Sequence, residues 1–175
     1  MNIESLFKIT YGLFVISSAN DKKRSGYISN TVFQVTANPI RLAIGCSKDN
    51  FTASLIAKSM AFSVSVLKKD CRPDIIGTFG YRTGSEIDKF SKFSYNNGLN
   101  NIPVLMEDTI AWFECKVVQT VDVGTHLLFI GNVLNGEIID DKSEPLTYAY
   151  YRDVKKGKAP KNAPTYIDYE TSMSK

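Results

Sequence analysis

The sequence predicts a mainly β fold, a small antiparallel barrel with a few flanking helices. Runs of apolar and β-branched residues are separated by short polar turns, which is typical of strands joined by hairpins. Helical patterns interrupt these runs only two or three times and do not alternate with them, so a doubly wound βα fold is not expected. Closing the sheet into a barrel removes the exposed edges that an open antiparallel sheet would have.

The bulk composition describes an ordinary folded domain. The chain has 175 residues, of which 43% are apolar and 22% are charged, a balance typical of one globular domain with a sizeable core. The formal net charge of +3 is mild. A nucleic-acid partner is therefore not expected, because such a partner needs a concentrated basic face.

Membrane association and metal binding are not expected either. No apolar run reaches the roughly 18 residues of a membrane span. Residues 1–5 lack the basic and apolar regions of a signal peptide, so we expect a cytoplasmic protein. The three cysteines, Cys46, Cys71 and Cys115, are isolated, and with the single histidine they form no zinc or iron–sulfur spacing. We expect them to be reduced and mostly buried.

The elements of the N-terminal half follow from local patterns. Residues 1–10 place three apolar side chains on one face, which predicts a short helix. The polar stretch 20–26 lies between two β-rich runs and predicts a hairpin. A helix is expected to start at Asp49 or Asn50, which are good N-caps, and another at residues 70–73, where proline stands in the first turn. The predicted strands are 13–18, 27–36, 41–46 and 62–67.

The C-terminal half contains the two longest predicted strands, 110–121 and 126–139, joined by a short turn that contains glycine. Before them, residues 80–101 are rich in Gly, Ser, Asn and Lys and predict a long irregular excursion, a kind of loop that tends to be functional. Residues 155–175 show no period, so we expect an extended tail after a domain that covers residues 1–154.

The segment 46–52 is the first candidate binding site, because an apolar strand there runs into a helix. Free N–H groups and the helix dipole attract anions to such a helix start. A phosphate site would use Lys48 as a point charge and Ser47 and Thr52 as neutral donors. The plainer alternative, which the segment taken alone favours, makes Asn50 only an N-cap and Lys48 a solvated side chain.

Three consecutive polar residues, Ser29, Asn30 and Thr31, interrupt an otherwise apolar strand. Side chains alternate between the two faces of a strand, so at least one of the three must point toward the core or a ligand. An unpaired polar group is costly there. A flat heteroaromatic ring edged with carbonyls and ring nitrogens would satisfy these groups. A bulge or an edge strand is the alternative.

Residues 77–84 place two aromatics and an arginine among glycines. The glycines are not spaced as GxGxxG and do not follow a strand, and no Walker lysine motif is present, so the Rossmann and P-loop fingerprints are absent. One interpretation is a lid in which Arg82 forks onto a phosphate beside Phe79 and Tyr81. A plain surface loop is the other.

His126 directly follows a tight turn and begins a strand. No neighbouring carboxylate or cysteine suggests a triad, so hydrolase chemistry has no support. Beside a redox cofactor its imidazole could donate a hydrogen bond or a proton near neutral pH; otherwise the residue is structural or merely exposed.

The tyrosines of 148–151 are expected in the core or at a subunit interface. The lysines of 155–158 and Lys161 predict a solvated tail or, alternatively, a dock for an acidic partner.

Taken together and in order, these segments resemble the flavin reductase-like family, the FMN-binding split barrels. The resemblance covers nearly the whole chain and rests on the ordered set of motifs rather than on any single one. Within the family, residues 79–84 and 156–166 look most like the flavoredoxin-like and rubredoxin-associated reductases of anaerobes. The matching segments are Gly26-Tyr27-Ile28-Ser29-Asn30-Thr31-Val32-Phe33-Gln34-Val35-Thr36, Asn38-Pro39, 46–52, Phe62-Ser63-Val64-Ser65-Val66-Leu67, Gly124-Thr125-His126, Phe129-Ile130-Gly131-Asn132-Val133 and Pro145-Leu146.

The resemblance implies a six-stranded antiparallel split β-barrel with Greek-key connections, in a homodimer with one flavin per subunit. It implies FMN as the cofactor, with FAD possible, and NAD(P)H as a transient co-substrate. Carried over, His126 is the catalytic candidate near the flavin ring, and Thr125 stands where the family usually has an aspartate. The cofactor-binding candidates are Ser29, Asn30 and Thr31 near the ring or ribityl chain, Cys46, Ser47, Lys48, Asn50, Phe51 and Thr52 around the phosphate, and Phe79, Tyr81 and Arg82 in the lid.

Two functions follow as expectations. In the first, an oxidoreductase passes electrons from NAD(P)H through bound flavin to free flavin or to a small redox protein such as rubredoxin. In the second, an FMN-binding, flavoredoxin-like protein shuttles electrons between proteins without itself using nicotinamide. A barrel that has lost its flavin and serves as a binding module is a more distant third. The sequence does not separate the first two.

Overall fold

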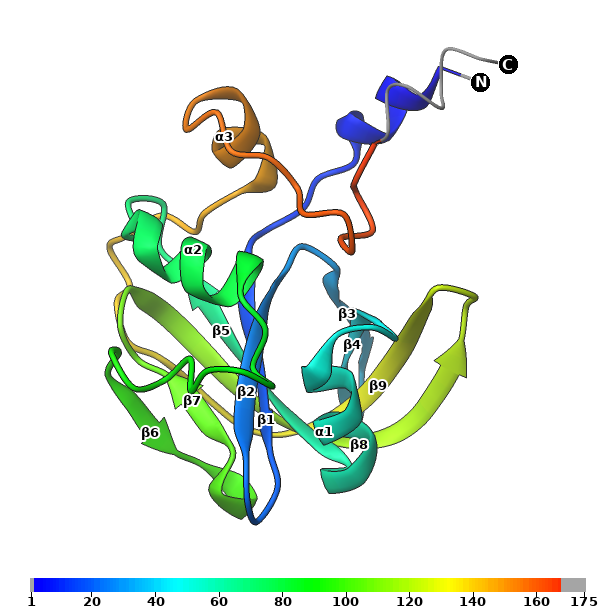
Figure 1. Ribbon diagram of the computed structural model, residues 1–175, viewed down its shortest axis with the longest axis vertical. Helices are drawn as coiled ribbons and strands as arrows, with labels where there is room; N and C mark the ends of the chain where they lie inside the picture. Colours follow the sequence, from blue (N-terminus) through cyan, green and yellow to red (C-terminus); the bar gives the residue numbers. More distant parts are fainter. Residues whose placement is uncertain (1, 168–175) are drawn as a thin grey trace.

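The computed structural model describes residues 2–167, except for the side chain of Ile3, and shows a curved β structure with helices at its rim (Figure 1). Seven antiparallel strands pair in the order β2-β1-β5-β8-β9-β4-β3, and two short strands form a separate ladder. The strands are β1 Phe14–Ala19, β2 Arg24–Ser29, β3 Val32–Ala37, β4 Ile40–Ser47, β5 Ala61–Leu67, β6 Tyr95–Asn97, β7 Pro103–Leu105, β8 Thr109–Asp122 and β9 His126–Ile138.

The large sheet curls into a barrel whose two end strands, β2 and β3, are consecutive in the chain. These strands stand at opposite ends of the pairing order, yet only Asn30 and Thr31 separate them in the chain. The Gly45 N–H donates to the Thr31 carbonyl at 3.1 Å and extends the β3–β4 pairing toward the break. The Tyr27 hydroxyl of β2 donates to the Gly45 carbonyl of β4 at 2.8 Å and so links the two sides of the closure. Counted as one broken strand, β2 and β3 complete six strands, so the predicted six-stranded split barrel is confirmed.

Two apolar cores lie on the two faces of this sheet. Alternation along β1 sends Ile16 to the barrel interior, with Phe62 and Phe129, and Val15 to the outer face, where Phe79 packs. Each fully buried side chain of this size stabilises the fold by roughly 1.5–3 kcal/mol relative to exposure. All three cysteines are buried and free, as predicted.

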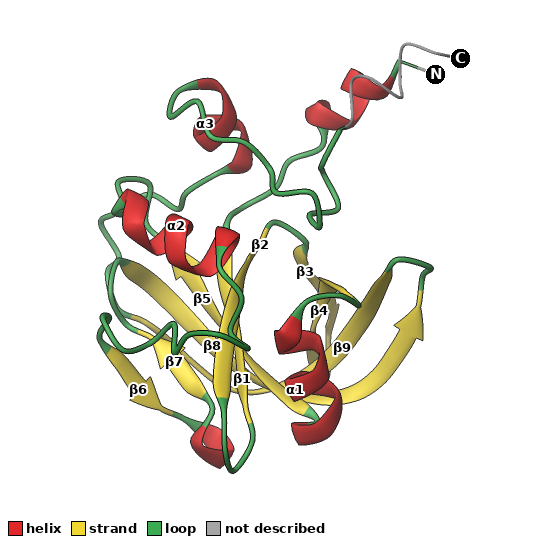
Figure 2. Cartoon of the chain, in the orientation of Figure 1, coloured by secondary structure: helices red, strands yellow, loops and turns green. Residues whose placement is uncertain are grey.

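The predicted helix starts are confirmed at two places. Helix α1, Phe51–Ser59, begins after the N-cap Asn50, whose side chain accepts a hydrogen bond from the Thr52 N–H. Helix α2, Pro73–Tyr81, begins with the proline. The predicted N-terminal helix is the 3₁₀ helix Ile3–Lys8. Figure 2 shows α1 and α2 beside the yellow strands and the N-terminal 3₁₀ helix apart from them.

The remaining elements are short, and the sequence did not indicate them. Strands β6 and β7 pair with each other, with the 3₁₀ helix Leu99–Asn101 between them, so the last part of the excursion is more regular than predicted. Helix α3, Tyr148–Asp153, is capped by the Thr147 hydroxyl. Its buried Tyr148 belongs to the outer core, as one of the two interpretations of the tyrosines had it.

Residues 155–167 contain no helix or strand, as expected for a tail, but they are folded back against the barrel. In Figure 1 this segment, orange to red, runs from α3 past the end of the barrel where β2 passes into β3. The rest of the predicted tail, 168–175, lies outside the described residues. Among residues 2–167, no helix is both long enough and apolar enough to span a membrane.

Candidate functional site

A cavity of about 570 Å³ opens at one end of the barrel. There β4 ends, β9 begins, β2 passes into β3, and residues 158–166, which we call the strap, cross in front (Figure 1). Antiparallel register brings the two strand ends together, because Ser47 pairs with His126. The lining residues are Thr31, Gly45, Ser47, Asp49, Val123, Thr125, His126, Leu128, Lys161, Asn162, Ala163, Pro164 and Tyr166.

The turn from β4 into α1 supplies one side of the cavity. The buried Ser47 hydroxyl accepts a 3.3 Å hydrogen bond from the Asp49 N–H, and the Asn50 side chain is occupied by the Thr52 N–H at 2.9 Å. The Lys48 N–H donates to the Thr125 carbonyl at 3.1 Å, which ties this turn to the start of β9. Ser47 and the start of α1 therefore lie beside the cavity in a fixed geometry.

Lys48, the predicted phosphate ligand, points elsewhere. Its ammonium lies 2.7 Å from the Asp122 carboxylate, and both side chains are largely exposed. This hydrogen bond holds the pKa of Asp122 below its usual range. Lys48 does not line the cavity, so its charge is directed to an ion pair on the surface.

The three polar residues of the broken strand occupy the junction of β2 and β3. The Ser29 hydroxyl accepts from the Thr31 N–H at 3.2 Å, and the Asn30 amide donates to the Thr165 hydroxyl of the strap at 2.7 Å. Thr31 lines the cavity, and Gly45 faces it closely; a β-carbon on Gly45 would lie 3.1 Å from the Thr31 methyl carbon. The break between β2 and β3 therefore also places a polar side chain, Thr31, at the edge of the cavity.

His126 lies in the cavity wall with both ring nitrogens engaged. Nδ1 lies 2.9 Å from the Thr125 hydroxyl oxygen, and Nε2 lies 3.2 Å from the Asn162 carbonyl oxygen. A carbonyl can only accept, so Nε2 carries the hydrogen and Nδ1 accepts from the hydroxyl in the neutral ring. The histidine thus presents an N–H at the cavity mouth.

Several predicted site residues have side chains outside the cavity. Cys46 is fully buried in the barrel interior, and burial raises its pKa to about 12. The buried Thr52 hydroxyl donates to the Ser25 hydroxyl at 3.1 Å. Phe79 packs in the outer core against Phe90. Phe51 lies under the Lys23 ammonium, 5.5 Å from the ring centre.

The predicted lid residues Tyr81 and Arg82 stand at the end of α2. Tyr81 is 54% exposed, and its hydroxyl donates to the Lys158 carbonyl at one end of the strap. Arg82 lines a different open cavity of about 1000 Å³, with Asp74 and Lys92. The structure therefore connects Tyr81 to the strap and places Arg82 apart from the first cavity.

Sequence reasoning missed the strap as part of the site. Its lysines suggested a solvated tail, whereas Lys161, Pro164 and Tyr166 line the cavity. Two prolines and a tyrosine within seven residues were the available signal, because they restrict the backbone and supply apolar surface. The contribution of Leu128 to the apolar wall of the cavity was also not predicted, because the sequence around Leu128 is that of an ordinary strand.

Comparison with known proteins identifies the family. The family model for the flavin reductase like domain matches residues 6–157. The chain belongs to this family. The ferric-chelate reductase (NAD(P)H) of Archaeoglobus fulgidus is 40% identical over 168 residues, which cover 96% of this chain and 99% of that protein. The high molecular weight rubredoxin of Moorella thermoacetica is 39% identical over 166 residues, 95% of this chain and 72% of that protein.

Solved structures share the barrel. The NADH:FAD oxidoreductase of Streptomyces globisporus superimposes with a TM-score of 0.74 at 19% identity, covering 82% of this chain and 84% of that one. Flavoredoxin of Methanosarcina acetivorans gives a TM-score of 0.68 at 23% identity, covering 74% and 69%. At these identities the likeness establishes a common fold.

The chemical types of the side chains around the cavity fit a flavin nucleotide. Ligand cavities commonly measure a few hundred Å³ and combine apolar walls with a few polar groups. Here Leu128, Pro164 and Tyr166 supply apolar and aromatic surface, and hydroxyls and an imidazole N–H supply donors. A planar ring with polar edges and an anionic tail matches this mixture of surfaces.

Proposed function

We propose that the chain binds FMN in this cavity and acts as an oxidoreductase that passes electrons from NAD(P)H to free flavin or to a small redox protein such as rubredoxin. The family match over residues 6–157 carries the proposal. The meeting of Thr31, Ser47 and His126 at one cavity supports it, because the three come from different parts of the chain.

The residues divide into a phosphate side and a ring side. We assign the phosphate to the start of α1, where Ser47 lines the cavity and the helix dipole favours an anion. We assign the ring to the side of Thr31 and Leu128, which line the cavity; Asn30, next to Thr31, holds the strap through Thr165. We propose FMN as the flavin, with its phosphate beside the Ser47 hydroxyl.

A bound flavin supplies the redox chemistry, taking up hydride from a nicotinamide and releasing electrons to an acceptor. The protein residues bind, orient and exclude water. The Nε2–H of His126 donates to the Asn162 carbonyl of the strap, and the Thr125 hydroxyl donates to Nδ1. A nucleotide that displaced this carbonyl would receive the same hydrogen bond. The strap covers part of the cavity with Pro164 and Tyr166.

Partners and organisation belong to the same proposal. The rubredoxin-named relative extends beyond the match, since the match covers 72% of it, and this supports a rubredoxin-like acceptor. The strand segment β8-β9-β4-β3 carries exposed Phe33, Val35, Val118 and Leu134, an apolar surface suited to a second copy of the chain. We propose a homodimer, a flavin domain over 1–154 followed by a tail over 155–175, and a cytoplasmic location where NAD(P)H is available.

A specific contact favours the second candidate, an electron carrier that does not use nicotinamide. The strap carbonyl of Asn162 already occupies the His126 N–H, so a nicotinamide approaching this side has to displace the strap. In this case FMN stays bound and the protein exchanges electrons only with other proteins.

Equilibrium titration of flavin-free protein with FMN, FAD and riboflavin tests the binding proposal. Identification of the flavin released from the purified protein accompanies it. We expect FMN to bind more tightly than riboflavin, because the phosphate contributes charge-assisted hydrogen bonds. Protein that stays colourless and binds none of the three contradicts the proposal and favours the barrel that has lost its flavin.

A further inference from the structure

We propose that Lys161 of the strap, and not Lys48, is the cation that binds a phosphate group of the ligand in the cavity. The inference rests on the proposed function and deepens it, because it names an anion-binding residue on a segment that sequence patterns assign to a solvated tail. The phosphate belongs either to the flavin mononucleotide or to the nicotinamide nucleotide, and both present the same chemistry to an ammonium group.

The position of Lys161 is fixed by contacts on both sides of it. Before it, the Lys158 carbonyl accepts from the Tyr81 hydroxyl. After it, the Asn162 carbonyl meets His126 Nε2 at 3.2 Å, and the Thr165 hydroxyl accepts from the Asn30 amide at 2.7 Å. These bonds link the strap to α2, to β9 and to the junction of β2 and β3.

The strap also holds its own shape. The Ala163 N–H donates to the Pro160 carbonyl at 2.9 Å, and the Tyr166 N–H donates to the Ala163 carbonyl at 3.0 Å. Proline at 160 and 164 restricts the backbone on either side of Lys161. The lysine is therefore presented to the cavity by an ordered turn.

The charges around the cavity make Lys161 the available cation. Lys48 is engaged 2.7 Å from Asp122. Asp49 lines the cavity and carries a negative charge, which opposes an anionic ligand. Lys161 lines the same cavity and forms no ion pair with any residue in the described part of the chain. Lys161 therefore brings a positive charge to a cavity that Asp49 also lines, and no ion pair among the described residues uses that charge.

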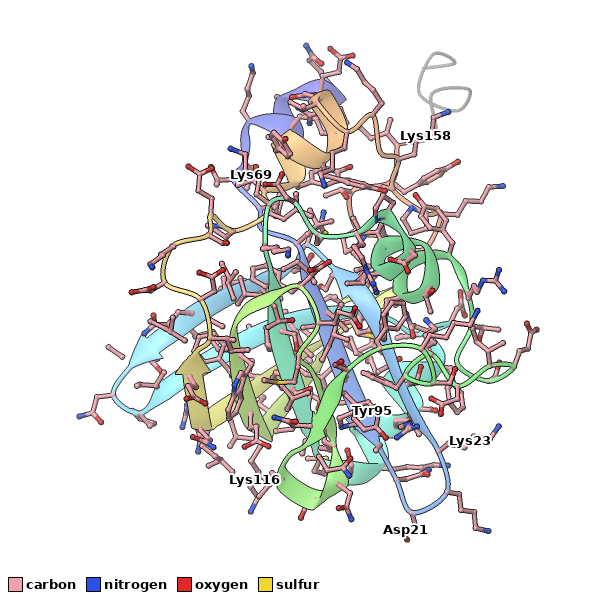
Figure 3. All side chains as sticks on the ribbon, turned by 90° about the vertical axis from the view of Figure 1, so that its left-hand side faces the viewer. Asp21, Lys23, Lys69, Tyr95, Lys116 and Lys158 are labelled. Carbon is pink, nitrogen blue, oxygen red and sulfur yellow. The ribbon has the colours of Figure 1, made fainter. Side chains whose placement is uncertain are left out.

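Lys161→Met and Lys161→Arg, with Lys158→Met as the matched control, form the test. Lys158 stands in the same strap without lining this cavity, and Figure 3 shows it high above the barrel strands. For a flavin phosphate, Lys161→Met weakens FMN binding by roughly tenfold to a hundredfold, the value of a hydrogen bond to a charged group. Riboflavin binding stays as in the control, and Lys161→Arg retains most of the FMN affinity.

A second measurement separates the two sources of phosphate. If Lys161 binds the nicotinamide nucleotide, FMN affinity is unchanged in Lys161→Met, whereas the KM for NADH or NADPH rises by a similar factor with little change in kcat. If neither FMN affinity nor KM differs from that of the Lys158→Met control, or if Lys48→Met weakens FMN binding more than Lys161→Met does, the proposal is wrong.

Inorganic pyrophosphate separates this inference from the proposed function. Calorimetric titration of the full chain with pyrophosphate reports on the anion site without any flavin. Binding that is lost in Lys161→Met but kept in Lys158→Met supports the inference even if no flavin binds. If Lys161→Met and the control agree in FMN affinity, in the KM for NADH and NADPH and in pyrophosphate binding, the inference is overturned and the proposed function stands. Wild-type protein that binds neither probe contradicts both.

Discussion

The proposed role of His126 affects turnover and not the binding of the flavin. Its Nε2–H faces the Asn162 carbonyl at the cavity mouth, and Thr125 holds Nδ1. We predict that His126→Ala keeps FMN affinity within about threefold but lowers turnover with NAD(P)H roughly tenfold to a hundredfold, as expected when a positioned proton donor is lost. Flavin titration and steady-state kinetics measure the two quantities. Complete loss of flavin binding would instead assign the histidine to cofactor retention.

Individual residues also show where sequence patterns reach their limit. The sequence around Asn50 is enough to predict an N-cap, and the sequence around residues 29–31 is enough to identify them as unusually polar for a strand. Both predictions follow from simple spacing rules for helix ends and strand faces. The direction of a side chain within a turn is not local. The ion pair between Lys48 and Asp122 joins residues 74 positions apart, and no spacing rule indicates it.

At the scale of elements, α1 depends on its N-cap. The Asn50 side chain accepts from the Thr52 N–H at 2.9 Å, so Asn50→Ala should lower the free energy of unfolding by about 1 kcal/mol. Asn50→Ser, which restores a capping oxygen, should recover most of that loss in urea unfolding. If Asn50→Ala is as stable as the wild type, the cap does not stabilise this helix.

The excursion between α2 and β8 is attached to the barrel by a buried amine. Lys89 Nζ donates to the Gly26 carbonyl of β2 at 2.8 Å and to the Phe79 carbonyl of α2 at 3.2 Å. Burial lowers the pKa of Lys89 to about 8, against an ordinary value of 10.5. Between these two values the unfolded chain binds more protons than the folded one, so this group makes stability rise with pH.

We therefore predict that Lys89→Met removes a pH dependence. From about pH 8 to 10, the wild type should gain roughly 1–3 kcal/mol of unfolding free energy relative to Lys89→Met. Urea unfolding at the two pH values measures the difference. The exposed neighbour Lys92 provides the control, because Lys92→Met should run parallel to the wild type. If the unfolding free energies of Lys89→Met and of the wild type change with pH in parallel, burial does not lower the pKa of Lys89.

Long elements were predicted from the sequence more successfully than short ones. The long strands β8 and β9 were expected at 110–121 and 126–139 and are found at Thr109–Asp122 and His126–Ile138, because their patterns extend over many residues. Strands β6 and β7 have three residues each, too few for a period to appear. Helix α3 depends on the packing of Tyr148 into the outer core, which is a tertiary effect.

For the whole molecule, the barrel leaves large apolar side chains of β3 and β9 exposed. Phe33 on β3 is 50% exposed and Leu134 on β9 is 53% exposed, and a homodimer would cover them. We predict that Phe33→Lys combined with Leu134→Lys shifts the protein to monomer in sedimentation equilibrium. Asp21→Lys, a charge change at the tip of the β1–β2 hairpin (Figure 3), should leave the mass unchanged. A wild type that sediments as a monomer contradicts the dimer.

The global fold was predictable because strand order, hairpin links and family motifs agree along the chain. The site was predictable only in part. Thr31, Ser47 and His126 line one cavity, but the strap reaches that cavity through contacts such as the one between Asn30 and Thr165, which are 135 positions apart. No local spacing rule indicates such a contact.

The central claim is that bound FMN receives electrons from NAD(P)H. Anaerobic rapid mixing of the flavin-loaded protein with NADH and with NADPH tests it most directly. We predict that at least one of the two bleaches the flavin absorption within the turnover time, and that an electron acceptor then restores it. Flavin that stays bound and oxidised with both nucleotides, yet is reduced by a protein electron donor, would contradict the reductase and establish the electron carrier in its place.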